Sequence, residues 1–119
     1  MIDIVRLETS ARSSRVVIYN GVVYVGGMTP LDDSGDIKDQ TRQTLERIDK
    51  YLALAGTDKS RLLTAQIWLK NIANDFQGMN EVWNAWTVPG AAPTRATAQA
   101  EMADPDLRVE IIVTAAVGE

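Results

Sequence analysis

The sequence contains neither cysteine nor histidine. The absence of cysteine excludes disulfides, thiolate nucleophiles and zinc–thiolate centres. The absence of histidine removes the most frequent general base and the most frequent metal ligand in proteins. Any acid–base chemistry in this chain must therefore depend on carboxylates, lysines, tyrosines or water. The remaining residues indicate no metal site.

Long apolar runs and an excess of positive charge are also missing. No apolar stretch approaches the roughly 18 residues that span a bilayer, and the first residues, Met1–Val5, lack the basic and apolar regions of a signal peptide. The net charge is -4, whereas binding to a phosphate backbone requires clustered lysine and arginine. We therefore expect a cytoplasmic chain with neither a nucleic acid nor a membrane as its partner.

The composition that remains fits one folded domain over residues 1–119. Hydrophobic residues make up 45% and charged residues 24% of the chain, which is ordinary for a globular protein. A chain of this length buries about two-thirds of its unfolded surface, so a substantial core can form. No repeat, linker or low-complexity tract divides the sequence.

Apolar periodicity and turn residues predict six strands and two helices. The strands are expected at Ile2–Leu7, Arg15–Tyr19, Val22–Gly26, Arg61–Lys70, Pro93–Met102 and Leu107–Ala115, and the helices at Asp39–Ala55 and from Asn74 or Asp75 to Trp86. Because strands and helices interleave, we expect an α+β fold in the order β-β-β-α-β-α-β-β. Two helices should cover one face of a mainly antiparallel sheet.

Two glycine-containing pairs mark the N-terminal half. Asn20-Gly21 lies between β-branched runs, and a type I′ turn needs a positive φ at both central residues, so this pattern predicts a hairpin. Gly26-Gly27 ends the hairpin with a bare backbone. That backbone suits either the close approach of a ligand or a second chain, or a simple bulge at the end of the strand.

End signals and apolar positions predict the extent and the packing of the two helices and of the strand between them. The first helix is expected to begin at an N-cap Asp39 and to stop before Gly56. The strand over residues 61–70 is apolar on both faces, which predicts that it is covered on both sides. The stripe of the second helix is interpreted as core packing rather than as a cofactor site; it comprises Phe76, Met79, Val82, Trp83 and Trp86.

The last two strands carry the candidate chemistry. As antiparallel neighbours around a turn at residues 103–106, they would place Arg95 near one end of the pair and Glu110 on the adjacent strand. An arginine that can hold a carboxylate, beside a carboxylate that can hold a water, is the simplest chemistry available here. By itself, a strand arginine is more often solvated or ion-paired, and Glu110 is more often a salt-bridge partner of Arg108 or Arg95.

The sheet face opposite the helices is expected to be part apolar and part polar. We assign Thr97, Gln99, Ile112 and Thr114 to it. Either this face meets water or a second copy of the chain covers it. The mixture favours self-association into a ring with clefts between subunits.

Several short pieces of the chain, in order and at matching separations, resemble the Rid family, also called YjgF. They are residues 20–30, Gln43-Thr44-Leu45, Phe76-Gln77-Gly78-Met79-Asn80 with Trp83 and Trp86, Ala92-Pro93-Thr94-Arg95, and Val109-Glu110-Ile111. Each piece is short, but together they extend over nearly the whole chain.

The resemblance implies a chorismate-mutase-like fold and a homotrimer with three sites between subunits. It implies cofactor-free hydrolysis of 2-imino acids, formed from enamines such as 2-aminoacrylate, to 2-oxo acids and ammonia. Arg95 matches the family arginine that pairs with the substrate carboxylate. Glu110 matches the glutamate that positions the attacking water, and Asn80 matches an asparagine near the site.

Two stretches depart from the family pattern. Residues 11–15 stand where well-studied members carry Gly-Pro-Tyr, and Gly26-Gly27-Met28 stands where they carry Ser-Gly-Gln, which indicates a divergent subgroup. In these stretches we expect ligand contacts from backbone N–H groups near Gly27 and from Ser14, which is otherwise an ordinary loop residue.

Two classes of function therefore stand. The first is an enamine or imine deaminase. The second is a non-catalytic trimer that binds small carboxylates as a sensor or an interaction module. Nuclease activity fits poorly with an acidic chain that has no histidine.

Overall fold

The computed structural model describes residues 2–119 and has the predicted order of strands and helices, with one short 3-10 helix before the fourth strand. The elements are β1 (Val5–Thr9), β2 (Ser14–Tyr19), β3 (Val22–Met28), α1 (Ile37–Leu54), η1 (Lys59–Arg61), β4 (Leu62–Leu69), α2 (Ile72–Trp86), β5 (Thr94–Gln99) and β6 (Val109–Ala116). Over the same residues, neither helix has the combination of length and hydropathy that a bilayer crossing requires.

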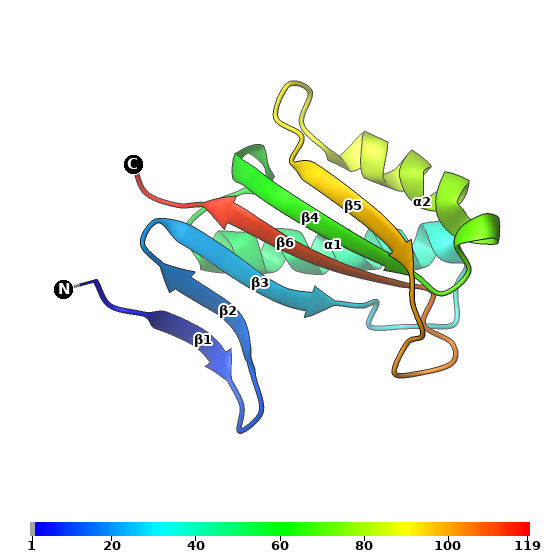
Figure 1. Cartoon of the computed structure of the whole chain (residues 1–119), viewed down its shortest axis with the longest axis horizontal. Coiled ribbons are helices and arrows are strands. Elements are labelled where there is room, and N and C mark those ends of the chain that lie inside the picture. The colour runs from blue at the N-terminus through cyan, green and yellow to red at the C-terminus, as the bar shows by residue number, and fades with distance from the viewer. Residues whose placement is uncertain (1) are drawn as a thin grey trace.

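The strands form one six-stranded sheet in the order β1-β2-β3-β6-β4-β5. All neighbours are antiparallel except β4 and β5, which run parallel. Both helices lie behind the sheet in Figure 1, so one face is covered by helices and the other, here called the open face, is not. The predicted α+β class, the mainly antiparallel sheet and the one-sided helical layer are confirmed.

The expected pairing of the last two strands is wrong, because β4 lies between β5 and β6. The chain leaves β4, returns through α2 and adds β5 beside β4 in parallel, as a strand–helix–strand crossover does. The long connection from Gln99 to Val109 then passes the end of β4, and β6 enters the sheet between β4 and β3. Arg95 and Glu110 are therefore not on adjacent strands.

The predicted hairpin is confirmed at its turn. Asn20 and Gly21 both have positive φ, 51° and 78°, and Tyr19 pairs with Val22 across the turn. A type I′ turn needs this backbone geometry at both central positions, and Asn-Gly tolerates it at low cost.

Gly26 and Gly27 form a bulge inside β3. Val25 pairs with Val113 and Met28 with Ile111, so two residues of β3 stand opposite one residue of β6. The bulge keeps both Val25 and Met28 on the buried face, where they are 2% and 0% exposed. It therefore turns the two glycines toward the open face.

The N-caps of both helices lie three or four residues before the predicted ones. Asp36, not Asp39, caps α1 by accepting a hydrogen bond from the backbone N–H of Asp39. Asn71, not Asn74 or Asp75, caps α2 in the same way through the N–H of Asn74. The earlier starts add Ile37, which is buried, and Ile72, which is partly buried, to the apolar faces of the helices.

The predicted end of α1 is confirmed. Gly56 follows the last turn of the helix at φ +86°, the left-handed conformation that ends many helices.

The strand β4 is covered on one face only, which corrects the prediction of cover on both sides. Ala65, Ile67 and Leu69 are buried under the helices, whereas Trp68, on the open face, is 37% exposed. A second correction concerns Thr97 and Gln99, which pair in parallel register with Ile67 and Leu69 and so lie on the helix face. Of the four residues assigned to the open face, Ile112 and Thr114 do lie there.

Candidate functional site

Arg95 lies on the helix face of the edge strand β5, directly under α2. Its Nη1 donates a 2.7 Å hydrogen bond to Oδ1 of Asn80. Its guanidinium carbon lies 5.9 Å from the ring centroid of Phe76 and 5.7 Å from that of Trp83. Asn80 was predicted to lie near Arg95, and the structure brings the two together.

The aromatic rings beside Arg95 were interpreted from the sequence as core packing alone. Trp83 is 5% exposed and does belong to the core, whereas Phe76 is 41% exposed. Both rings attract the cation through cation–π interactions. The exposed ring of Phe76 also presents an apolar surface beside the cation. The helical spacing of Phe76 and Trp83 identified a buried stripe, but only the position of β5 shows that the stripe also holds an arginine.

Arg95 keeps an unneutralised charge in this place. Within residues 2–119 its guanidinium forms no ion pair. Burial lowers the pKa of Arg95 by disfavouring the charged form, but a guanidinium stays protonated at neutral pH. The interpretation of Arg95 as an ion-paired strand residue is therefore not supported, and a half-buried cation is available to an anionic ligand.

Glu110 lies on β6 and points to the open face. Its side chain extends over the bulge, because a Cβ built on Gly27 would lie 3.1 Å from Cδ of Glu110 and would overlap the carboxylate. Glu110 forms no ion pair with Arg95, Arg108 or any other residue among 2–119, so the alternative of a salt bridge is not supported. Burial raises the pKa of the Glu110 carboxyl above its ordinary value.

Ser14 lies at the start of β2, next to the same bulge. Its hydroxyl shares a 2.8 Å hydrogen bond with Oγ1 of Thr9, and its carbonyl oxygen lies 3.4 Å from the place of a Cβ on Gly26. Ser14 therefore adjoins the bulge through its backbone, but it alternates in phase with the buried Val16, so its side chain lies on the helix face of β2 and not on the open face with Glu110.

The predicted site is thus split into two halves within one chain. Arg95 shares its register row with Ala65 and Val113, whereas Glu110 shares its row with Trp68, three residues further along. The strand spacing and rise put their Cα atoms about 14 Å apart. Their side chains also leave opposite faces of the sheet, so one protomer cannot bring both to the same small ligand.

The half-buried carboxyl of Glu110 gives the chain a pH-dependent stability. A raised pKa in the folded state means that folding binds a proton between the ordinary and the raised value, so stability falls as pH increases through that window. The variant Glu110→Gln has no ionisable carboxyl at this position, so it does not lose stability in this way as pH increases. We expect its melting temperature to exceed that of the wild type at about pH 7.5 and to match it at about pH 4, as measured by calorimetry. Equal differences in melting temperature between variant and wild type at both pH values would contradict this explanation.

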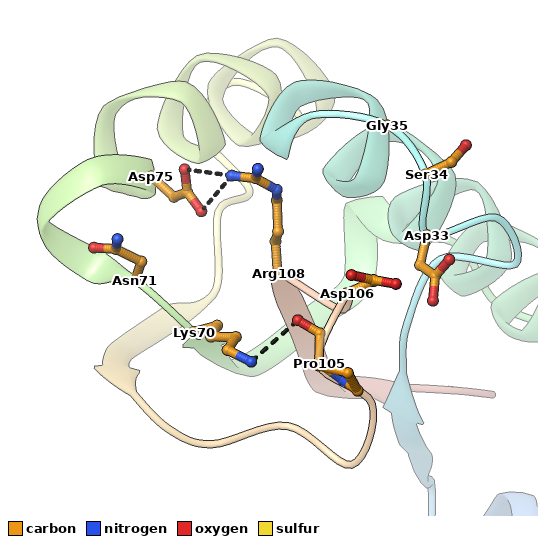
Figure 2. A pocket seen from close by; sticks show the side chains of 9 residues that line it. All are labelled: Asp33, Ser34, Gly35, Lys70, Asn71, Asp75, Pro105, Asp106 and Arg108. Carbon is orange, nitrogen blue, oxygen red and sulfur yellow. Dashed lines mark hydrogen bonds and ion pairs between the residues drawn. The ribbon is translucent and has the colours of Figure 1, made fainter.

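A hollow of about 490 Å³ lies away from both halves, between the start of α2, the β3–α1 loop and the β5–β6 connection. Figure 2 shows Arg108 paired with the buried Asp75 at 3.4 Å, and Lys70 donating a hydrogen bond to the carbonyl of Pro105. These cations are already used within the chain, so we place the candidate chemistry at Arg95 and Glu110 and not in this hollow.

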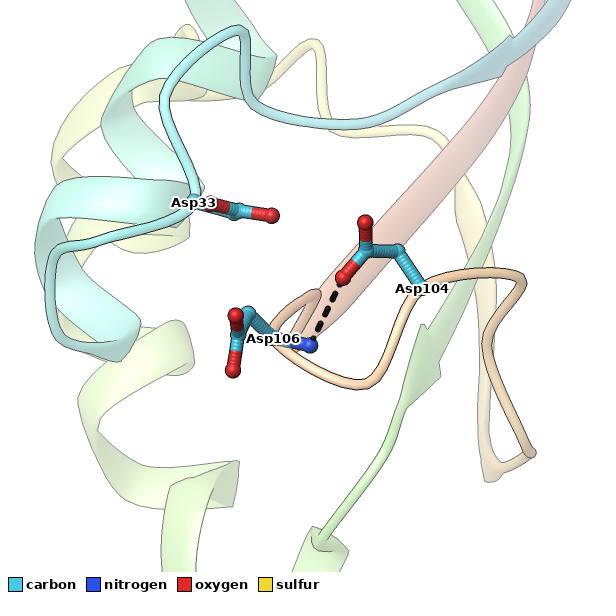
Figure 3. Close-up of side chains that lie close together, drawn as sticks. All are labelled: Asp33, Asp104 and Asp106. Atoms are coloured by element: carbon cyan, nitrogen blue, oxygen red, sulfur yellow. Dashed lines mark hydrogen bonds between the residues drawn. The ribbon is translucent and has the colours of Figure 1, made fainter.

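Three carboxylates gather beside that hollow. Those of Asp33, Asp104 and Asp106 lie within 4.8 Å of one another (Figure 3), and Asp104 also accepts a hydrogen bond from the N–H of Asp106. Oxygen ligands of this kind suit Mg²⁺ or Ca²⁺. The group is solvent-exposed on two loops, however, and a cluster of surface carboxylates is not by itself a metal centre.

The comparisons with known proteins show the family of this chain. A family model described as Endoribonuclease L-PSP matches residues 3–117. A RutC family protein of Haemophilus ducreyi is 47% identical over 114 residues, which is 96% of this chain and 97% of the relative. RutC family protein YoaB of Escherichia coli is 45% identical over 114 residues, with 96% and 98% covered.

Solved structures give the same result. An uncharacterized protein from Pseudomonas aeruginosa superposes with a TM-score of 0.94 at 44% identity, covering 98% of this chain and 100% of the other. NMB1025 from Neisseria meningitidis, a member of the YjgF protein family, has a TM-score of 0.94 at 38% identity, with 98% and 97% covered. The chain therefore belongs to the YjgF/RutC family, the Rid family that its sequence motifs resemble, whose model is described as Endoribonuclease L-PSP.

Proposed function

We propose that this protein hydrolyses 2-imino acids to 2-oxo acids and ammonia at sites that form between the protomers of a homotrimer. One protomer supplies Arg95 and Asn80, and its neighbour supplies Glu110 and Gly27. The observation that carries this proposal is the split site: Arg95 and Glu110 leave opposite faces of one sheet, and each keeps an unpaired charge within residues 2–119. Only a second copy can complete the pair.

The open face supports an assembly of this kind. It exposes large apolar side chains between threonines, among them Tyr24 at 47%, Leu63 at 43% and Trp68 at 37%. Large apolar side chains exposed on one face of a sheet favour a contact with another protein. Because Glu110 lies on the same face as Trp68, a copy that covers Trp68 also approaches Glu110.

The chemistry follows from the charges. Arg95 holds the substrate carboxylate by two parallel hydrogen bonds, which orients the neighbouring C=N carbon. The substrate reacts as its N-protonated iminium form, and water adds to that carbon while Glu110 takes one proton of the water, which gives a neutral carbinolamine. Glu110 then returns this proton to the nitrogen, the C–N bond breaks and ammonia leaves, while the hydroxyl proton passes to the Glu110 carboxylate and on to solvent as the C=O bond forms. Burial raises the pKa of the Glu110 carboxyl, which makes its carboxylate a stronger proton acceptor than an ordinary one.

The proposal is tested by ammonia release from imines that an amino-acid oxidase makes in situ. We expect the wild type to exceed the buffer rate and Arg95→Ala to lose about a hundredfold in kcat/KM, because the carboxylate is no longer held or oriented. Arg42→Ala is the matched control, since Arg42 is an exposed arginine on α1. A wild type that releases no ammonia above buffer yet binds 2-oxo acids through Arg95 would establish the second candidate, a non-catalytic carboxylate binder.

The bulge offers a test of the second half of the site. Neither Gly26 nor Gly27 has a left-handed φ, so alanine introduces no backbone strain at either position. A methyl group at Gly27 would overlap the Glu110 carboxylate, whereas one at Gly26 would make only an ordinary contact of 3.4 Å with the carbonyl of Ser14. We expect Gly27→Ala to lower kcat by about tenfold or more by displacing Glu110, and Gly26→Ala to stay close to wild type. Equal losses would show that the bulge does not position the carboxylate.

The description of the family model as an endoribonuclease names a different reaction. A nuclease of this chain would need to attract a phosphate backbone with a net charge of -4 and to cleave it without histidine. The composition therefore favours the small-molecule reaction.

A further inference from the structure

Three alternating residues of β5, Arg95, Thr97 and Gln99, face α2, and the middle one has no partner. Arg95 donates to Oδ1 of Asn80, and Oε1 of Gln99 accepts a hydrogen bond from the backbone N–H of Ile72 at the start of α2. Thr97 lies between these two contacts. Among residues 2–119, Thr97 Oγ1 is the one buried side-chain nitrogen or oxygen that forms no hydrogen bond.

A buried hydroxyl without a partner is costly and uncommon in proteins. Valine has nearly the shape of threonine and would remove that cost in this apolar position, so stability alone does not account for the hydroxyl. Thr97 also lies two residues from Arg95 on the same face of an edge strand, which puts their Cβ atoms about 7 Å apart. A carboxylate that binds a guanidinium keeps further oxygen lone pairs, and one of them can accept a hydrogen bond from a hydroxyl on the same strand face.

We propose that Thr97 is a further substrate-contacting residue, whose Oγ1–H donates a hydrogen bond to the carboxylate that Arg95 holds. This inference rests on the proposed function for the identity of the ligand. It adds a neutral donor beside the cation and so favours ligands that present a planar, two-oxygen acid group.

The proposed contact predicts a particular kinetic signature. The carboxylate takes no part in the reaction and is the same in the imino acid, the transition state and the 2-oxo acid product. An interaction with it is therefore uniform binding, which changes KM and leaves kcat almost unaltered. The KM for the imine and the Kd for the 2-oxo acid should change by the same factor.

The experiment compares Thr97→Val, which removes the hydroxyl, with Thr97→Ser, which keeps it. Thr94→Val, on the opposite face of the same strand, is the matched control. We expect Thr97→Val to be at least as thermally stable as the wild type, to raise KM about tenfold with kcat unchanged, and to weaken the binding of 2-oxobutanoate by the same factor. Thr97→Ser and Thr94→Val should stay within about twofold of the wild type.

The outcomes separate this inference from the proposed function. If Thr97→Val binds 2-oxobutanoate as tightly as the wild type does, Thr97 does not contact the ligand and the inference is overturned. If the wild type releases no ammonia but Thr97→Val still weakens 2-oxobutanoate binding, the deaminase proposal fails and the contact stands. A wild type that binds no 2-oxo acid overturns both.

Discussion

Mixed trimers of Arg95→Ala and Glu110→Gln chains should release ammonia far faster than either variant does alone. Arg95 and Glu110 point to opposite faces of one sheet, so each proposed site takes them from different protomers. In a mixture of equal parts, a site is intact when its Arg95 comes from the Glu110→Gln chain and its Glu110 from the Arg95→Ala chain. Random assembly of a cyclic trimer puts about a quarter of the sites in this arrangement.

The measurement is the rate of ammonia release after the two variants are unfolded and refolded together, with the mixed species counted by native mass spectrometry. The control mixes Arg95→Ala with Asn80→Ala. Arg95 and Asn80 are hydrogen-bonded within one protomer. Each site therefore takes both residues from the same chain, and no site in this mixture has both residues intact. Verified mixed trimers that remain inactive in the first mixture would contradict a shared site.

Replacing Gln40 with leucine should destabilise the folded chain strongly. Gln40 is 0% exposed on α1. Its Nε2 donates to the carbonyls of Asp33, Gly35 and Asp106 at 3.0, 3.2 and 3.0 Å, and its Oε1 accepts from the N–H of Arg108 at 2.8 Å. The hydrogen bonds of this one side chain therefore link the β3–α1 loop and the β5–β6 connection to α1.

Leucine has a similar volume, so the change leaves the packing and removes the hydrogen bonds. The freed N–H and carbonyl groups lie in a part-buried place, and we expect a loss of about 3 kcal/mol in the free energy of unfolding, measured with urea. Gln43→Leu is the control, because Gln43 bonds both backbone groups of Asp32 from an exposed position where water can replace it. Losses of equal size in the two variants would show that burial does not set the cost.

The sequence determined the features that depend on neighbouring residues. The Asn20-Gly21 turn, the order of strands and helices and the stop at Gly56 all follow from conformations that a few adjacent residues prefer. The alternation of β6 also holds, because Val109, Ile111, Val113 and Ala115 are strongly apolar and Glu110 and Thr114 are not. The family motifs rest on the same kind of local information.

Only the tertiary structure decided which residues of the site meet. Alternation tells which side chains of a strand share a face, but it does not tell which strand lies next to it, and β4 separates β5 from β6. On β5 the apolar and polar positions differ little, and the polar set, Arg95, Thr97 and Gln99, faces the helix because α2 supplies partners for Arg95 and Gln99 there. Pairing between strands distant in the sequence is set by the packing of the whole sheet against its helices, and that is why the split between Arg95 and Glu110 could not be read from the residues alone.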